Sequence, residues 1–253
     1  MGEHVAPASH KRKKRSNIFW NIVGVVGELL ITFAFIVGLF SVWQLYWTTY
    51  EVAGQVSQTI ASYEEEHQPS KRTLGEVRTD DPPAFDREVG DGEVYGLVHV
   101  PTWDWMKIPL AEGTTSYVLD QGWAGHYDMT TQPGGVGNFS IAGHRRTYGN
   151  NFRWIDRLTQ GDKVVVEVDD RYLVYSMVSS EIIDATDPTQ MRVVAPVIDD
   201  VSWSETPTER WMTMTTCHPE YGNWQRYIVH LKFESWTPKD TGVPAELVDE
   251  PTN

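Results

Sequence analysis

One long apolar segment near the N-terminus constrains this chain more than any other feature. Residues 18–46 are mostly apolar, and Glu28 is the only formal charge among them. An α-helix rises about 1.5 Å per residue, so roughly 20 residues cross the hydrocarbon core of a bilayer. Aromatic residues stand where a helix meets the membrane surface: Trp20, Trp43, Tyr46 and Trp47. We therefore predict one transmembrane helix over residues 17–47.

The residues before the apolar segment predict its orientation. Residues 1–16 contain the basic run Lys11 to Arg15 and a single acid, Glu3. Basic flanks stay on the cytoplasmic side, so everything after the segment is expected outside. The apolar core is longer than that of a cleaved signal peptide, and the residues after it form a poor cleavage site. We expect an uncleaved, single-pass anchor with a cytoplasmic tail over residues 1–16.

Composition divides the remainder into three parts. Residues 48–90 are polar and Pro-containing, which predicts an extracytoplasmic linker that is partly helical. Residues 91–236 contain the apolar runs of a folded domain. Residues 237–253 carry Pro and acidic residues without an apolar period, which predicts a disordered tail.

The folded part is predicted to be mainly β. Short apolar or alternating runs recur and are separated by Gly, Asp, Asn and Pro. These runs lie at residues 94–100, 137–144, 163–168, 171–183, 211–217 and 226–233. The best helical signal, at residues 151–158, is one or two turns long. Many short strands with little helix indicate a barrel or a sandwich.

Charge argues against two kinds of ligand. The chain has a formal net charge of -14, and its basic residues gather beside the apolar segment. Nucleic-acid binding depends on neutralising phosphates, so an acidic body excludes it. Four carboxylates flank the loop before residue 211: Asp184, Asp187, Asp199 and Asp200. They lack the spacing of a calcium loop, so we predict no metal site and no cofactor.

Cys217 is the only cysteine of the chain, so no internal disulfide can form. It stands at the end of a Thr-rich apolar run, where a strand would present a nucleophile. A thiol attacks as the thiolate and therefore needs a base or a cation nearby. The alternative is a small buried hydrophobic residue in a membrane-tethered binding module.

Candidate partners for the thiol are histidines and one arginine. His126 and His144 both lie near strand ends or loops, and the residue pattern does not choose between them. His218 is adjacent to Cys217, and neighbouring strand side chains point to opposite faces, which disfavours it. Arg226 opens the next predicted strand, so an antiparallel return would bring it beside Cys217 and let it stabilise negative charge.

Two blocks of this sequence resemble the signature blocks of the sortase family. They are GNFSIAGHRRTYGNNF, which contains His144, and TMTTCHPEYGNWQRYIVH, which contains Cys217 and Arg226. The residues around them are most similar to class E sortases of high-GC Gram-positive bacteria. The resemblance implies a closed sortase-type β-barrel of about eight strands with short helices, preceded by the transmembrane helix.

The resemblance also implies roles for these residues. His144, Cys217 and Arg226 would be catalytic, Thr216 would contribute to substrate binding through its backbone, and His126 would line the groove. The substrates would be secreted proteins with a C-terminal LPxTG-like or LAxTG-like sorting signal. The acceptor would be an amine of a peptidoglycan precursor or of a pilin. A hydrolytic cysteine peptidase would use the same residues, and only the resemblance separates it from a transpeptidase.

Overall fold

The computed structural model describes residue 2 and residues 17–67 and 72–251. The chain divides into two compact units, Met1–Gln44 and Leu45–Asn253. Helix α1 (Asn17–Glu66) contains the predicted apolar segment and runs on through residues 48–66 of the predicted linker. By length and composition α1 can cross a membrane. Apart from residue 2, the predicted basic tail lies outside the described residues.

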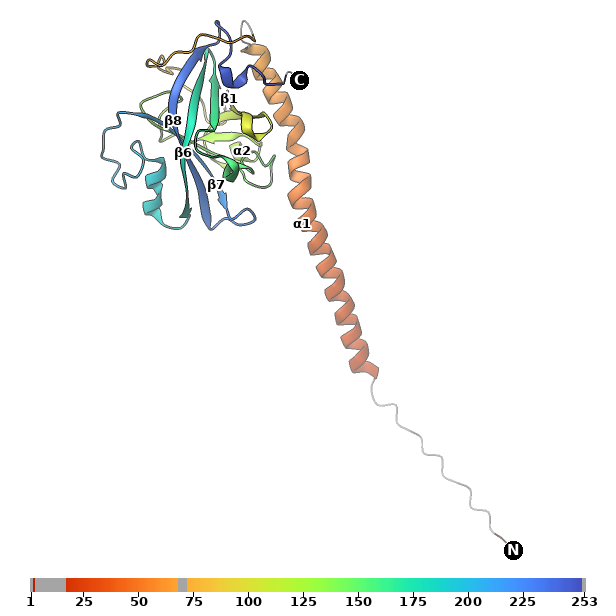
Figure 1. The fold of residues 1–253 in the computed structure, drawn as a ribbon. Coiled ribbons are helices and arrows are strands. Elements are labelled where there is room, and N and C mark those ends of the chain that lie inside the picture. The colour runs from red at the N-terminus through yellow and green to blue at the C-terminus, as the bar shows by residue number, and fades with distance from the viewer. Residues whose placement is uncertain (1, 3–16, 68–71, 252–253) are drawn as a thin grey trace. The chain divides into compact units, whose positions relative to one another are not determined.

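Eight strands close into a barrel (Figure 1). They are β1 (Val94–Val100), β2 (Met106–Glu112), β3 (Ala124–His126), β4 (Gly137–Ala142), β5 (Lys163–Val168), β6 (Arg171–Asp184), β7 (Arg210–His218) and β8 (Gln225–Pro238). The short helices are α2 (Ser116–Leu119), η1 (Pro101–Trp103), η2 (Ile155–Arg157), η3 (Pro188–Val194) and η4 (Ala245–Leu247). This architecture confirms the predicted mainly β, closed barrel.

The strand order around the barrel is β1-β2-β3-β4-β7-β8-β6-β5. Two neighbouring pairs, β2 with β3 and β4 with β7, are parallel, and the other neighbours are antiparallel. The interior is filled by alternate residues of the strands. Phe139 pairs with Met212 and Ile141 with Met214, and all four side chains are fully buried. This apolar packing fixes the β4–β7 register on which the site depends.

The segments on either side of the barrel pack against each other, contrary to what their composition predicts. Residues 74 and 78 form bridges with Val243 and Trp236, respectively. Val243 and Leu247 are buried in a small apolar cluster. The sequence predicts a disordered tail here, but up to residue 251 the structure orders it. The reason is that single buried side chains, spaced too widely to form an apolar period, anchor the segment.

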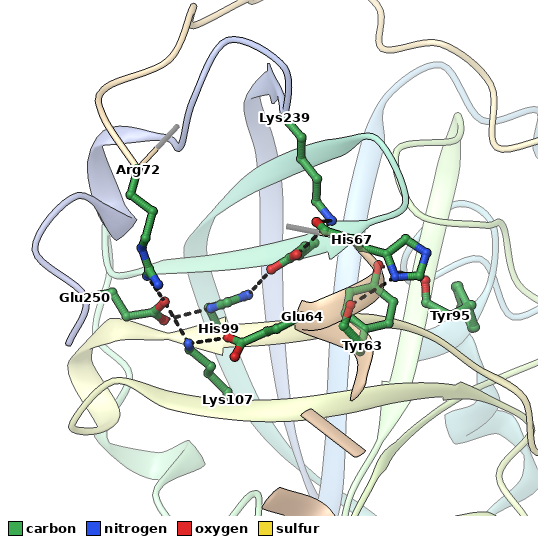
Figure 2. A network of polar contacts seen from close by, with 10 residues as sticks. Tyr63, Glu64, His67, Arg72, Tyr95, His99, Lys107, Lys239 and Glu250 are labelled. Atoms are coloured by element: carbon green, nitrogen blue, oxygen red, sulfur yellow. Dashed lines mark hydrogen bonds and ion pairs between the residues drawn. The ribbon is translucent and has the colours of Figure 1, made fainter. Parts of the chain in front are cut away.

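A buried polar network joins the end of α1, the barrel and this C-terminal segment (Figure 2). At its centre, His99 on β1 donates from Nδ1 to Glu250 and from Nε2 to Glu167, each over 2.8 Å. Burial opposes the charged imidazole, but the two carboxylates outweigh it and raise the pKa of His99 to about 9. Lys239 binds Glu167 over 2.7 Å, so the network contains both signs of charge.

Candidate active site

The thiol of Cys217 and the guanidinium of Arg226 are cross-strand neighbours. Cys217 lies near the end of β7, is half-buried and forms no disulfide. In the antiparallel β7–β8 register it stands directly opposite Arg226, near the start of β8. Side chains of directly opposed residues share one face, with Cβ atoms roughly 4.5–5.5 Å apart. The structure thus brings together the two residues that the sequence predicts to share a rim.

The Arg226 side chain is fixed to the loop between the two strands. Its Nη1 donates to the carbonyl oxygens of Asn223 (2.7 Å) and Gln225 (2.9 Å). Within the described part of the chain, its Nε and Nη2 groups have no hydrogen-bond partner. A positioned guanidinium with unused donors beside a nucleophile is suited to hold a carbonyl oxygen or an oxyanion.

His144 reaches the same rim through the parallel pairing of β4 with β7. Ala142 pairs with Thr215, and the Gly143 N–H donates to the Thr215 carbonyl over 3.1 Å. Two residues beyond this pair, the chains arrive at His144 and Cys217 respectively. The three predicted catalytic residues therefore come from neighbouring ends of β4, β7 and β8.

Asp120, which follows α2, orients the imidazole of His144. Its Oδ1 lies 2.8 Å from Nε2 of His144, so Nε2 carries a proton and donates it. The ring also lies against Tyr148, with centroids 5.4 Å apart. The sequence does not predict Asp120 or Tyr148 as residues of the site. Only the fold brings Asp120 to His144, and no motif spacing connects them.

Thr216 and His126 are both buried, so neither presents its side chain to a groove. The Thr216 hydroxyl donates to the Gly143 carbonyl over 2.6 Å, which ties the residue before His144 to β7. His126 is fully buried, and its ring nitrogens contact Glu112 (2.9 Å) and the Thr131 carbonyl (3.0 Å). The structure places Thr216 beside the site and His126 in the interior, so we leave His126 out of the site proposed below.

His218 is held by Arg145 instead of by the thiol. Its Nδ1 accepts from Arg145 Nη1 over 2.8 Å, and Arg145 Nη2 donates to Asp156 over 2.7 Å. Burial first, and then the Arg145 charge, lower the pKa of His218 below its usual range. Since its Nδ1 accepts from a cation, His218 is neutral and secures the loop after β4 to the end of β7.

Tyr127 adds a phenol beside the rim. Its hydroxyl and that of Thr215 are 2.9 Å apart. Burial raises the pKa of Tyr127, against the lowering effects of the Thr215 bond and the Arg226 charge, and the Cys217 charge raises it further. The phenol therefore stays neutral and available as a hydrogen-bond donor or acceptor. Among the described residues, no group of three or more His, Cys, Asp or Glu side chains could hold a metal ion.

The Sortase domain family model matches residues 98–234, more than half of the chain. This chain belongs to the sortase family. Over 229 residues the sortase is 36% identical to the curated sortase SrtE1 of Streptomyces coelicolor, a match that covers 88% of this chain and 60% of that protein. It therefore spans less than two thirds of the length of that relative.

Solved structures agree with this assignment. The SrtA sortase from Actinomyces oris is 44% identical, with a TM-score of 0.64 over 70% of this chain and 100% of that chain. The crystal structure of sortase E1 from Streptomyces coelicolor, with a tripeptide in its active site, is 38% identical. Its TM-score is 0.55 over 63% of this sortase and 99% of that chain. The similarity to class E sortases that the motif residues indicate is thus confirmed.

Proposed function

We propose that this sortase is a membrane-anchored cysteine transpeptidase. It cleaves a C-terminal LPxTG-like or LAxTG-like sorting signal between Thr and Gly and joins the freed acyl group to an amine. The observation that carries the proposal is the cross-strand pair of Cys217 and Arg226, with His144 at the neighbouring strand end. Class E membership favours LAxTG among the signals.

In the first half of the reaction, Cys217 passes its proton to His144 and Sγ bonds to the Thr carbonyl carbon of the signal. Arg226 stabilises the oxyanion with its unused donors. The Thr–Gly C–N bond then breaks, and protonated His144 gives its proton to the leaving glycine amine. A thioester on Cys217 remains.

In the second half, an incoming amine attacks the thioester carbonyl and loses a proton to His144. The C–S bond breaks, the sulfur leaves as thiolate, and a new amide forms. Cys217 then regains the proton held by His144, which restores the resting pair. The acceptor amine belongs to a peptidoglycan precursor or to a pilin, and the donors are secreted proteins that carry the signal.

We place the catalytic domain outside the cell and residues 1–16 inside. The support is the apolar part of α1, the basic run before it and the membrane association of the family. Single cysteines in a Cys217→Ala background test this, one at Ser9 and one at the exposed Met129. On intact protoplasts, a membrane-impermeant maleimide labels Met129→Cys and not Ser9→Cys; the reverse pattern contradicts the orientation.

The enzymatic test uses the whole chain in detergent micelles with a peptide containing LAxTG, with and without a glycine or diaminopimelate-type amine. Mass spectrometry follows the cleaved peptide, the thioester on Cys217 and the ligated product. We expect cleavage after Thr, a ligated product only with amine, and neither in Cys217→Ala. Cleavage that never yields a ligated product would identify a hydrolase instead. Absence of both cleavage and thioester on LAxTG and LPxTG peptides would reject the proposal.

A further inference from the structure

The second half of α1 lies against the barrel along one helical face. Within the unit that starts at Leu45, the covered positions of α1 recur at helical spacing. Their exposed fractions are lowest at Thr48, Val52 and Tyr63, with 8%, 7% and 5%. Residues between them, such as Ala53, are exposed. A stripe of covered residues at spacings of four and eleven lies on one face of an α-helix, which is the pattern of a docked helix.

The apolar part of this face ends on two glycines. A Cβ added to Gly122 would lie 2.9 Å from Val56 Cγ2 and 3.5 Å from Val52 Cγ2. A Cβ added to Gly149 would lie 3.6 Å from Val52 Cγ2 and 3.5 Å from the Cα of Gly122. The valines of α1 therefore fill the space where the loop after α2 meets the loop after β4.

These two loops hold His144. Asp120, which accepts the hydrogen bond from Nε2 of His144, lies two residues before Gly122. Tyr148, whose ring lies against the imidazole, directly precedes Gly149. Asn151 Nδ2 donates to the Trp123 carbonyl over 2.9 Å and ties the two loops together. Both supports of the imidazole thus stand on the surface that α1 covers.

The loop after β4 needs such support because its backbone is strained. Three non-glycine residues lie in the left-handed region: Thr147, Tyr148 and Asn150, with φ of 71°, 44° and 52°. Residues in this region persist only where the surroundings hold them. Contact with α1 through Gly149 is one such constraint.

A second, polar attachment fixes α1 along its axis (Figure 2). Glu64 accepts from Lys107 of β2 over 2.6 Å, and the Tyr63 hydroxyl donates to the Tyr95 carbonyl over 3.4 Å. The His67 carbonyl, one residue after the helix, accepts from Lys239 over 3.1 Å. These bonds prevent α1 from sliding, so Val52 and Val56 stay opposite the glycines.

We propose that the extracytoplasmic part of α1, residues 45–66, positions the catalytic imidazole: Val52 and Val56 support the loops that carry Asp120 and Tyr148. The anchor helix is then part of the catalytic architecture as well as a tether. The inference rests on the proposed function for its kinetic consequence, and on the structure alone for its effect on His144.

The test compares Val52→Asp with Ala53→Asp in the full chain in detergent micelles. Both variants place the same carboxylate on the same turn, but only the first places it against the loops. Misplacing a catalytic group by about 1 Å can cost on the order of 10²-fold, so we expect Val52→Asp to lower kcat by at least about tenfold with KM nearly unchanged. Ala53→Asp keeps the wild-type kcat, because Ala53 is exposed.

A second readout is independent of turnover. In protein labelled with ¹⁵N-histidine, we expect Val52→Asp to shift the imidazole signals of His144, assigned with His144→Gln, and to leave those of His99 and His230 in place. Ala53→Asp shifts none of them. If Val52→Asp also disturbs His99 and His230, the double variant Val52→Ala/Val56→Ala, which buries no charge, decides by the same criteria.

Unchanged kcat together with unchanged His144 signals would overturn the inference. So would a loss of kcat that Ala53→Asp reproduces. If the wild-type chain turns over no sorting peptide, the proposed function fails, while the His144 signals still decide whether α1 positions this ring.

Discussion

Arg226 combines a positive charge with a planar fork of N–H donors. Two loop carbonyls hold one of its terminal nitrogens, which leaves the other N–H groups for a substrate. Its position opposite Cys217 places this fixed charge where the tetrahedral intermediate of the proposed reaction would form. For this proposed role, the fixed geometry of the guanidinium donors matters as much as the charge.

Arg226→Lys separates these two contributions. Lysine keeps the charge but cannot bond the loop carbonyls and an oxyanion at once with fixed geometry. Loss of one oxyanion donor costs about 10²–10³ in kcat, so we expect a fall within this range and a nearly unchanged KM. Kinetics with the sorting peptide measure it, and an unchanged melting temperature serves as the control. Wild-type kcat in Arg226→Lys would show that charge alone is sufficient.

Asp120 supplies a second residue-level prediction. Asp120→Ala removes the acceptor for Nε2 of His144, and Asp120→Asn keeps an acceptor oxygen without its charge. General acid–base catalysis raises the rate by about 10²–10⁴-fold. We expect Asp120→Ala to lower kcat by roughly tenfold, because the imidazole is then less well oriented. Asp120→Asn should lose less than Asp120→Ala. Steady-state kcat values give the order, and equal values for both variants and the wild type would show that Asp120 does not orient the ring.

At the scale of elements, the parallel pairing of β4 and β7 brings the histidine to the cysteine. The sequence could predict both strands from their apolar runs, and the resemblance could name His144 and Cys217. The residue pattern alone could not predict that the two strands are parallel neighbours, since more than sixty residues and two other strands separate them. The link from Asp120 to His144 depends on α2 and on the antiparallel pairing of β3 with β4, so no local pattern contains it.

Strands without a clear apolar run escaped prediction. β2 (MKIPLAE) contains a proline and two charges, and β3 has only three residues. Where the sequence predicts a short helix at residues 151–158, the structure has only the single 3-10 turn η2. In each case the contacts that define the element come from distant parts of the barrel.

Thr216→Val tests the hydrogen bond that joins β7 to the residue directly after β4. The substitution removes the hydroxyl that donates to the Gly143 carbonyl, so this buried acceptor loses that hydrogen bond. We expect the free energy of unfolding to fall by about 1–3 kcal/mol. Urea titration monitored by tryptophan fluorescence measures it. The exposed Thr208→Val is the matched control, expected within about 0.5 kcal/mol of the wild type; an equal effect of both variants would contradict the assignment.

At the scale of the whole molecule, the buried network around His99 connects segments from opposite ends of the unit Leu45–Asn253. His99 lies on β1, Glu64 on α1 and Glu250 near the C-terminus. Burial alone would raise the pKa of Glu250, but the bond from His99 lowers it below its usual range. His99 and Glu250 therefore depend on each other for the charge that each carries.

Stability should depend on pH through His99. Its pKa of about 9 exceeds the ordinary 6.5, so its contribution is complete below about pH 6.5 and disappears as pH rises through about 9. At about 1.4 kcal/mol per pKa unit, the loss is at most about 3.5 kcal/mol. We expect the wild-type free energy of unfolding to fall across this window and His99→Gln to abolish the slope.

A suitable control is His218→Gln. The pKa of His218 is lowered, so this ring is already neutral above its ordinary value and contributes no slope in the same window. Chemical denaturation at several pH values from 6.5 to 9 compares the three proteins. Parallel profiles for the wild type and His99→Gln would refute the role given to His99.

Residues 74 and 78 contact Val243, after β8, and Trp236, near the end of β8, and these contacts bear on where the chain can be cut. The family model spans residues 98–234, but the side chains that complete the structure extend to Glu250 on one side and into α1 on the other. The limits of the family model are thus narrower than the part of the chain that folds together. A fragment cut at these limits would lack α1 itself, and with it Lys239 and Glu250, which join the end of α1 and the C-terminal segment to the barrel.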